Sequence, residues 1–383
     1  MKRKCKNVDI SDLEFIELSV NQCLTGKTKT RNDIVRIFEE YSDTHQIALQ
    51  LHKEIINRKL ELKPICYKDK FDENSQKWRT IGIQDIKQQM YDYIAVNGLT
   101  ELFPRIGKYQ CASIKGRGQV YCAKAVYNHI QDKSIKYACQ FDIRKYYESV
   151  SQDNMMKWLE KHVKNEPLLW LIRTLLSTFK KGLSIGSYLS QHLANLYLSD
   201  LYHQINENMH RIRNKKNGQC IRVNLVSNCF FYMDDILIIG SNSRDLIKAS
   251  KMIIDEVEKL GLEIKSNWRC FDLGNNFIDI CGYTIYKDHV GVRRGTLKKM
   301  RRAFVRFSKK QNNLELARRV ISYCGILEHS NCYRFCQKYN VYALKKKARK
   351  VVSNYAKNKK LHQTAESGCK GDVRRNCLGV HQS

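Results

Sequence analysis

The stretch "CFFYMDDILIIG", residues 229–240, decides the fold because it places two adjacent carboxylates between two strongly apolar runs. Runs of this length and composition predict buried strands, and the pair between them predicts a tight hairpin with Asp234 and Asp235 at its tip. Taken alone, two Asp are more often an ordinary polar turn. In a buried sheet, however, two like charges are stable together only if a cation lies beside them.

A second acid-terminated strand changes the balance between these interpretations. The segment "YACQFDI", residues 137–143, is a short apolar run that carries Asp142 near its end. If the two strands are neighbours, three carboxylates converge, and carboxylate oxygens are the ligands that Mg²⁺ prefers. Two such ions about 4 Å apart activate a 3′-hydroxyl and stabilise a departing pyrophosphate. The pattern therefore predicts nucleotidyl transfer.

The charge of the chain points to a polyanionic partner. Lys and Arg number 68 against 38 acids, which gives a net charge of +30, and residues 291–360 carry 21 Lys/Arg against two acids. Nucleic acid is the first candidate partner, an anionic membrane surface the second, and a basic surface kept for solubility the third. We find no signal peptide and no apolar window long enough to span a bilayer. We therefore expect a cytoplasmic protein without membrane association, whose 15 scattered cysteines are reduced.

The order of elements predicts an α+β fold with an antiparallel sheet at its centre. We expect helices in residues 1–60, a hairpin with a polar turn at 72–76, a helix over 85–103 and a glycine-rich loop at 111–119. After the strand at 137–143 we expect one long helix over 187–209, the Asp-Asp hairpin and a helix that stops at Gly261. A second hairpin at 278–292 with its turn at Asp288, basic helices from Thr296 and a loose tail complete the chain.

Six motifs together resemble those of reverse transcriptases, in the same order. "YMDD" (232–235) resembles their catalytic box, and "QFDIRKYYESV" (140–150) their first aspartate motif. The segment "GLSIGSYLSQHLANLYL" (182–198) resembles the loop and helix between these two. "KWRTIGIQD" (77–85), "LGLEIKSNW" (260–268) and "FIDICGYTI" (277–285) are similar to the fingers motif, the lysine motif and the primer-grip hairpin. The resemblance covers roughly residues 60–350 and implies a right-hand polymerase of fingers, palm and thumb.

The resemblance also assigns residues. It implies that Asp142, Asp234 and the backbone carbonyl of Ile143 hold two Mg²⁺ ions, with Mn²⁺ as an alternative, and that Asp235 is a weaker or second ligand. For the incoming deoxynucleotide it implies Lys77, Arg79, Tyr147, Ile185, Gly186 and Lys265. For nucleic acid the candidates are Lys115, Gly116, Arg117, Ser190, Gln191, Tyr232, Met233, Gly282, Tyr283, Arg301 and Arg302.

Two of these positions carry a more specific expectation. An aromatic residue near Tyr147 clashes with a 2′-hydroxyl in the family and so selects deoxyribonucleotides; Tyr146, or a plain core tyrosine, is the alternative. Ile185 stands where many relatives have Gln, so we expect low copying fidelity. The "IGxxxSQ" form is similar to the enzymes of diversity-generating retroelements and to bacterial reverse transcriptases of antiphage defence.

The expected organisation is an N-terminal helical extension (1–60), fingers and palm (61–290), a basic helical thumb (291–360) and a flexible tail (361–383). Expected partners are a template or dedicated non-coding RNA, a DNA primer or the cDNA product, deoxynucleotides, and a helper protein or second copy. Antiphage defence is the favoured role. The alternatives are a mutagenic retroelement enzyme, a template-independent or protein-primed polymerase, and a catalytically silent RNA-binding protein. Tyr147 argues against an RNA-synthesising polymerase.

Overall fold

The structure is a computed structural model that describes residues 2–72 and 77–376. The chain divides into two compact units, Met1–Asn276 and Phe277–Ser383. Residues 1–60 belong to the first unit, and the division lies ahead of residue 291, where the sequence places the start of the thumb. The helices and strands occupy 52% and 17% of the chain, so the predicted α+β class is confirmed.

Three helices precede the sheets, as predicted for the N-terminal region: α1 (Leu13–Leu24), α2 (Asn32–Glu40) and α3 (Thr44–Ile56). The carboxylates of Asp12 and Asp43 accept hydrogen bonds from the backbone N–H of Phe15 and Gln46, which caps α1 and α3. α1 packs against α3 and against α4 (Ile86–Gly98). The N-terminal helices are thus joined to the helix that follows the first hairpin.

The first hairpin pairs β1 (Cys66–Asp72) with β2 (Lys77–Ile83) in antiparallel register, as predicted. Residues 73–76 of its polar turn lie outside the described residues. Further helices follow in the order η1 (Thr100–Arg105), α5 (Gln119–Ile130), α6 (Tyr146–Ser149), α7 (Gln152–His162) and α8 (Glu166–Ser177). The sequence interpretation did not identify α6 or α8.

The central sheet has the strand order β3-β7-β8-β4-β9. Its strands are β3 (Gln110–Cys111), β7 (Asn228–Tyr232), β8 (Asp235–Gly240), β4 (Tyr137–Asp142) and β9 (Arg269–Asp272). Neighbours are antiparallel except β3 and β7, which run parallel, so the prediction of an antiparallel sheet needs correction at this edge. β3 is a short strand that leads into a loop and α5 rather than into a hairpin with β7, so nothing forces the antiparallel direction. α11 (Ser243–Lys259) packs on β4, β8 and β9.

The prediction of one long helix over 187–209 is wrong. The segment forms α9 (Tyr188–Tyr197) and α10 (Ser199–Glu207), which are interrupted at Leu198. The hydroxyl of Ser199 donates a 2.7 Å hydrogen bond to the carbonyl of Leu196. Such a side-chain bond competes with the helical backbone pattern and bends helices.

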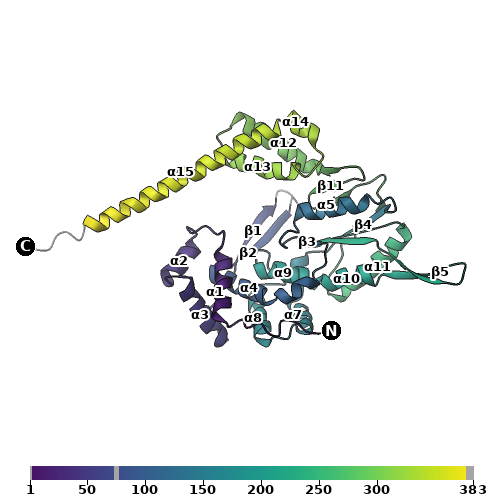
Figure 1. The fold of residues 1–383 in the computed structure, drawn as a ribbon, viewed down its shortest axis with the longest axis horizontal. Coiled ribbons are helices and arrows are strands. Elements are labelled where there is room, and N and C mark those ends of the chain that lie inside the picture. Colours follow the sequence, from purple (N-terminus) through teal and green to yellow (C-terminus); the bar gives the residue numbers. More distant parts are fainter. Residues whose placement is uncertain (1, 73–76, 377–383) are drawn as a thin grey trace, which may run out of the picture. The chain divides into compact units, whose positions relative to one another are not determined.

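The chain forms a two-stranded ribbon after α10 and before β7, which the sequence interpretation did not identify. β5 (His210–Asn214) pairs with β6 (Cys220–Asn224), and the ribbon projects from its unit (Figure 1). Gly218 has a φ of +79° in the connecting turn. The Asn217-Gly218 dipeptide is a strong local signal for such a hairpin.

The second unit begins with a three-stranded sheet of β10 (Ile278–Ile280), β11 (Tyr283–Ile285) and β12 (Val290–Val292). The prediction of a single hairpin here needs correction. Cys281 and Gly282 both have positive φ, 55° and 84°, which makes a tight two-residue turn ahead of the predicted turn at Asp288.

Basic helices follow this sheet, as predicted: α12 (Arg294–Lys309), α13 (Leu314–Leu327), α14 (Tyr333–Lys338) and α15 (Val341–Asn376). Residues 361–376, for which the sequence favours a loose tail, continue α15; they contain no proline to end the helix. Residues 377–383 lie outside the described residues. None of the described helices is both long enough and apolar enough to cross a membrane.

Candidate active site

The Asp-Asp hairpin is built as the sequence predicts. Tyr232 of β7 pairs with Asp235 of β8, so Met233 and Asp234 form the two-residue turn. Met233 has a φ of +54°, an uncommon conformation for a residue with a side chain. The backbone N–H of Ile143 donates a 3.1 Å hydrogen bond to the carbonyl of Asp234 and ties the turn to the neighbouring strand. The strained turn is therefore held by its surroundings.

The strand that ends in Asp142 is the neighbour of the strand that begins with Asp235, and the two residues face each other in the register. Residues directly opposite in an antiparallel pair lie on one face, with Cβ atoms about 4.5–5.5 Å apart, and like charges there are destabilising. Burial and the negative charge of Asp142 raise the pKa of Asp234, and the nearby cations Lys265 and Arg79 oppose that rise. The three predicted acids therefore lie at one end of β4 and β8.

Lys265 is the nearest described countercharge. Its ammonium forms an ion pair with the Asp142 carboxylate, and its backbone N–H donates a 2.9 Å hydrogen bond to the Asp142 carbonyl. The segment after α11 is also tied to the end of β4 by an isolated bridge between Ile143 and Ile264. The lysine is thus held beside Asp142 by its own backbone N–H and by the bridge at the preceding residue.

The donor set suits a hard divalent cation by its chemistry, since it comprises three carboxylates and the carbonyl at Ile143. Within residues 2–72 and 77–376, no three His, Cys, Asp or Glu side chains are gathered closely enough to hold an ion as they stand. Lys265 provides the positive charge beside Asp142 instead. The residues therefore fit Mg²⁺ or Mn²⁺ by type, and the Asp142 carboxylate is engaged by the lysine.

The two tyrosines after Asp142 have different surroundings. The hydroxyl of Tyr147 donates to the Met233 sulfur at 3.8 Å, which places it against the Asp-Asp turn. Burial and the charge of Asp234 raise the pKa of Tyr147 to about 12. Tyr146 is 2% exposed, and its hydroxyl donates a 2.6 Å hydrogen bond to the Ala194 carbonyl. Tyr147 faces the acids, and Tyr146 belongs to the core.

The β1–β2 hairpin brings the two predicted triphosphate ligands to the same ribbon. Lys77 pairs with Asp72 and Arg79 with Lys70 across the strands. The Arg79 guanidinium lies 3.3 Å from the Asp72 carboxylate, and its positive charge also acts to lower the pKa of Asp234. Arg79 therefore lies within electrostatic reach of the acids, with half of its side chain exposed.

The loop that carries Ile185 and Gly186 lies directly against β2. The N–H of Gly82 donates a 2.8 Å hydrogen bond to the Ile185 carbonyl. Gly186 has a φ of +111°, and a Cβ built there would lie 2.5 Å from the Gly82 carbonyl oxygen. Both the conformation and the close approach require glycine.

The reverse transcriptase (RNA-dependent DNA polymerase) family model matches residues 68–285, which is more than half of the chain. The chain belongs to this family. It is an RNA-directed DNA polymerase, and the predicted enzyme class is confirmed. No curated protein matches the chain.

The reverse transcriptase contains one buried acid near the site that the sequence interpretation missed. Asp92 of α4 accepts hydrogen bonds from the Ser187 hydroxyl at 2.7 Å and from the Leu189 N–H at 3.2 Å, at the start of α9. Gln84 donates a third bond from the end of β2. Burial raises the pKa of Asp92 to about 6. Nothing near Asp92 in the sequence signals this role, because Ser187 and Leu189 are 95 and 97 residues away along the chain.

Of the predicted nucleic-acid contacts in the first unit of this polymerase, some are exposed and some are not. Lys115 and Gly116 are exposed in the glycine-rich loop, and Gly116 has a φ of +79°. The Arg117 guanidinium donates a 2.8 Å hydrogen bond to the Gly107 carbonyl and so braces that loop. Ser190 is fully buried and accepts from the Ser184 N–H, whereas Gln191 is partly exposed. Ser190 thus shapes the loop and does not face solvent.

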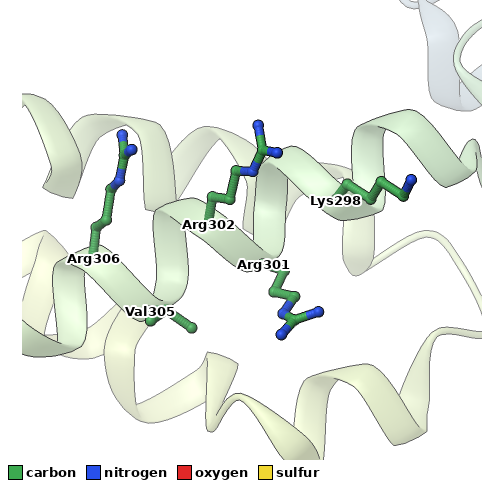
Figure 2. A pocket seen from close by; sticks show the side chains of 5 residues that line it. All are labelled: Lys298, Arg301, Arg302, Val305 and Arg306. Atoms are coloured by element: carbon green, nitrogen blue, oxygen red, sulfur yellow. The ribbon is translucent and has the colours of Figure 1, made fainter.

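In the second unit of the reverse transcriptase, Gly282 lies in the tight turn and Tyr283 is 2% exposed. Arg301 and Arg302 lie on the solvent face of α12. Figure 2 shows these arginines with three further residues around a shallow hollow of about 500 Å³: Lys298, Val305 and Arg306. No carboxylate of the described chain lies within ion-pair distance of these four cations, so their charge is available to a phosphate backbone.

Proposed function

We propose that this reverse transcriptase copies RNA into DNA by two-metal nucleotidyl transfer. The observation that carries the proposal is the register of β4 and β8, which sets Asp142 opposite Asp235 beside the Asp234 turn. Asp142, Asp234 and the Ile143 carbonyl would hold the metals, and Asp235 would assist. When bound, two Mg²⁺ ions activate the primer 3′-hydroxyl and stabilise the leaving pyrophosphate.

The residues around the acids would bind and orient the incoming deoxynucleotide. Arg79 offers a planar fork to phosphate oxygens and Lys77 a point charge. Lys265 would exchange its contact with Asp142 for the pyrophosphate as the metals bind. Tyr147 lies against Met233 and would exclude a 2′-hydroxyl by steric contact.

Outside the acids, the contacts with nucleic acid would be made to the phosphate backbone. The exposed cations of α12 and Lys115 of the glycine-rich loop suit this role, because such contacts need charge and no base reading. Template RNA, the DNA strand and deoxynucleotides are the general partners of reverse transcriptases.

The proposed biological role is antiphage defence in a bacterial cell, with a dedicated non-coding RNA as template. The N-terminal residues 1–60 and the cysteine-bearing tail support it, because they have no counterpart in the retroelement motifs, whereas the "IGxxxSQ" form is similar to both classes. The second candidate is a mutagenic retroelement enzyme. Ile185 favours it, because an aliphatic side chain cannot hydrogen-bond to a nascent pair. Phage plating on cells that carry the gene and its flanking DNA, wild type against Asp142→Asn, tests the first; the misincorporation rate of Ile185→Gln tests the second.

The catalytic proposal is tested by Asp142→Asn and Asp234→Asn, with Asp255→Asn on the exposed side of α11 as the matched control. We expect both site variants to fold and to lose DNA synthesis by at least about 100-fold, since each removes a carboxylate that would hold the metal ions. The control should retain activity. Full activity in a folded site variant would refute the assignment.

The same assay separates the remaining functions. Pretreatment with ribonuclease should abolish DNA synthesis if RNA is the template. Product that survives the treatment points to template-independent synthesis, and label that remains on protein after nuclease digestion points to protein priming. No incorporation with any nucleotide set points to a silent RNA-binding protein.

A further inference from the structure

The ribbon of β5 and β6 is a basic arm that no part of the proposed chemistry uses. Residues 210–224 carry five Lys/Arg and no Asp or Glu. Each strand has five residues, so the arm is roughly 16 Å long. It projects from its unit (Figure 1), and residues 212–220 are all exposed. A segment of this charge cannot neutralise itself.

The base of the arm is fixed, so the arm has a defined direction. The Leu225 N–H donates a 2.9 Å hydrogen bond to the Met209 carbonyl, and both side chains are 2% exposed. Arg211 forms a two-pronged ion pair with Asp245 at the start of α11, at 2.8 and 3.2 Å. Arg222 donates to the Glu207 carbonyl at the end of α10. Two of the five cations thus anchor the arm.

The other three cations remain toward the tip. Among the described residues, no carboxylate lies within ion-pair distance of Arg213, Lys215 or Lys216. Arg213 pairs with Ile221 on one face of the ribbon, and Ile212, which is 69% exposed, pairs with the anchoring Arg222 on the other. The face that carries Arg213 therefore has a cation beside an apolar side chain, and the other face presents an exposed apolar side chain.

The arm lies away from the catalytic turn. β6 leads through Leu225–Ser227 into β7, and the Asp-Asp turn is at the other end of β7. Since β7 has five residues, the base of the arm is roughly 16 Å from the turn along the strand. The arm is therefore placed to contact nucleic acid outside the copied base pair.

We propose that this arm binds a structured RNA by its phosphate backbone, at a site separate from the catalytic centre. RNA is the expected ligand because the chain belongs to a family of RNA-directed DNA polymerases. The positive charge of the arm is complementary to the negative charge of an RNA backbone. Double-helical RNA has a wide, shallow minor groove that displays 2′-hydroxyls, and proteins recognise it by shape and by contacts with these hydroxyls and the phosphates on either side. The arm would anchor a folded region of the template or its scaffold while another region is copied.

The test compares a ribbon variant with a control of equal charge change. The ribbon variant is Arg213→Gln/Lys215→Gln/Lys216→Gln. The control is Lys157→Gln/Lys161→Gln/Lys164→Gln, three exposed lysines on and after α7 of the same unit. Affinity for a long RNA hairpin is measured from 50 to 200 mM salt. Losing three phosphate contacts should reduce the salt slope by about 2.7, so the wild type should lose about 40-fold more affinity than the variant over this range.

DNA synthesis on a short primer–template duplex should be unchanged in both variants, because that substrate does not reach the arm. Equal salt slopes for the ribbon variant and the control would overturn the proposal. An equal loss with a DNA hairpin of the same sequence would overturn the assignment to RNA, and reduced activity on the short duplex would place the arm in the catalytic machinery instead. If the triple variant is unstable, Lys215→Glu/Lys216→Glu in the exposed turn provides the same test. Failure of the two-metal proposal would appear only in the synthesis assay, so the two outcomes are distinguishable.

Discussion

Gly186→Ala should disrupt the joint between the first hairpin and the loop before α9. The two segments contact each other through backbone atoms. The Gly82 N–H donates to the Ile185 carbonyl, and Gly186 packs closely against the Gly82 carbonyl oxygen. A methyl group at residue 186 would lie 2.5 Å from that oxygen, which real Cβ atoms essentially never do. Backbone on one side or the other must move.

The magnitude follows from three costs. A residue with a side chain at a φ of +111° is strained by about 1–3 kcal/mol. Relief of the overlap by a backbone shift costs about 1–3 kcal/mol, as other overpacked sites do. Loss of the Gly82 hydrogen bond costs about 0.5–1.5 kcal/mol. We therefore expect Gly186→Ala to lower the free energy of unfolding by about 2.5–7.5 kcal/mol.

Gly26→Ala is the matched control. Gly26 lies in the same unit, has a φ of +76° and would place its Cβ in open space, so only the conformational strain remains. It should cost about 1–2 kcal/mol. Urea unfolding followed by circular dichroism measures both variants, and single-nucleotide incorporation at varied deoxynucleotide concentration shows whether the joint also positions the substrate. If Gly186→Ala costs no more than Gly26→Ala, the close approach is not a constraint on the fold.

Three further perturbations test neighbouring groups. Tyr147→Val should admit ribonucleotides at least about tenfold better relative to deoxyribonucleotides, read by competing incorporation; unchanged discrimination would assign the gate elsewhere. Lys265→Met should destabilise the metal-free protein by about 1–3 kcal/mol, because a charged hydrogen bond to Asp142 is lost. Added Mg²⁺ should raise the melting temperature of this variant more than that of the wild type, because the ion no longer displaces an ammonium. An equal rise in both proteins would contradict this. Asp92→Asn tests the direction in which stability changes with pH. Folding raises the pKa of Asp92 from 3.8 to about 6, so the unfolded chain releases this proton at lower pH than the folded chain. The stability of the wild type should therefore fall as the pH rises from 4 to 6, by up to about 3 kcal/mol. Stability of Asp92→Asn should lack this decline in urea unfolding at pH 4.5 and 7, and a parallel decline in both proteins would contradict the assignment.

The catalytic hairpin was predictable because its signals are local. Apolar runs that end or begin with an acid indicate β7, β8 and β4. Acids buried in a sheet are stable together only beside a cation, which predicts that these acids lie close to one another. The register of Asp142 with Asp235 then follows from the two strands being neighbours. The resemblance added the identity of the loop and lysine motifs, which no local rule supplies.

Other features were not predictable for equally physical reasons. The division of α9 from α10 depends on one serine hydroxyl that binds the preceding turn, and serine is common inside helices. The role of Asp92 depends on partners from β2 and α9. By contrast, the arm of β5 and β6 did carry a local signal in Asn217-Gly218, between two short alternating segments.

The cluster of acids at the Asp-Asp turn is unfavourable by itself, and the surrounding residues offset its free-energy cost. Met233 at positive φ costs about 1–3 kcal/mol, and two facing carboxylates repel each other. The apolar residues on both sides of the turn oppose these costs, since Phe231 and Ile236 are each 1% exposed and each buried side chain of this size contributes about 1.5–3 kcal/mol. Lys265 offsets the remaining repulsion while no metal is bound. The buried sheet therefore keeps an unfavourable cluster of charge in place, and a cation that binds there gains the attraction that the fold has already arranged.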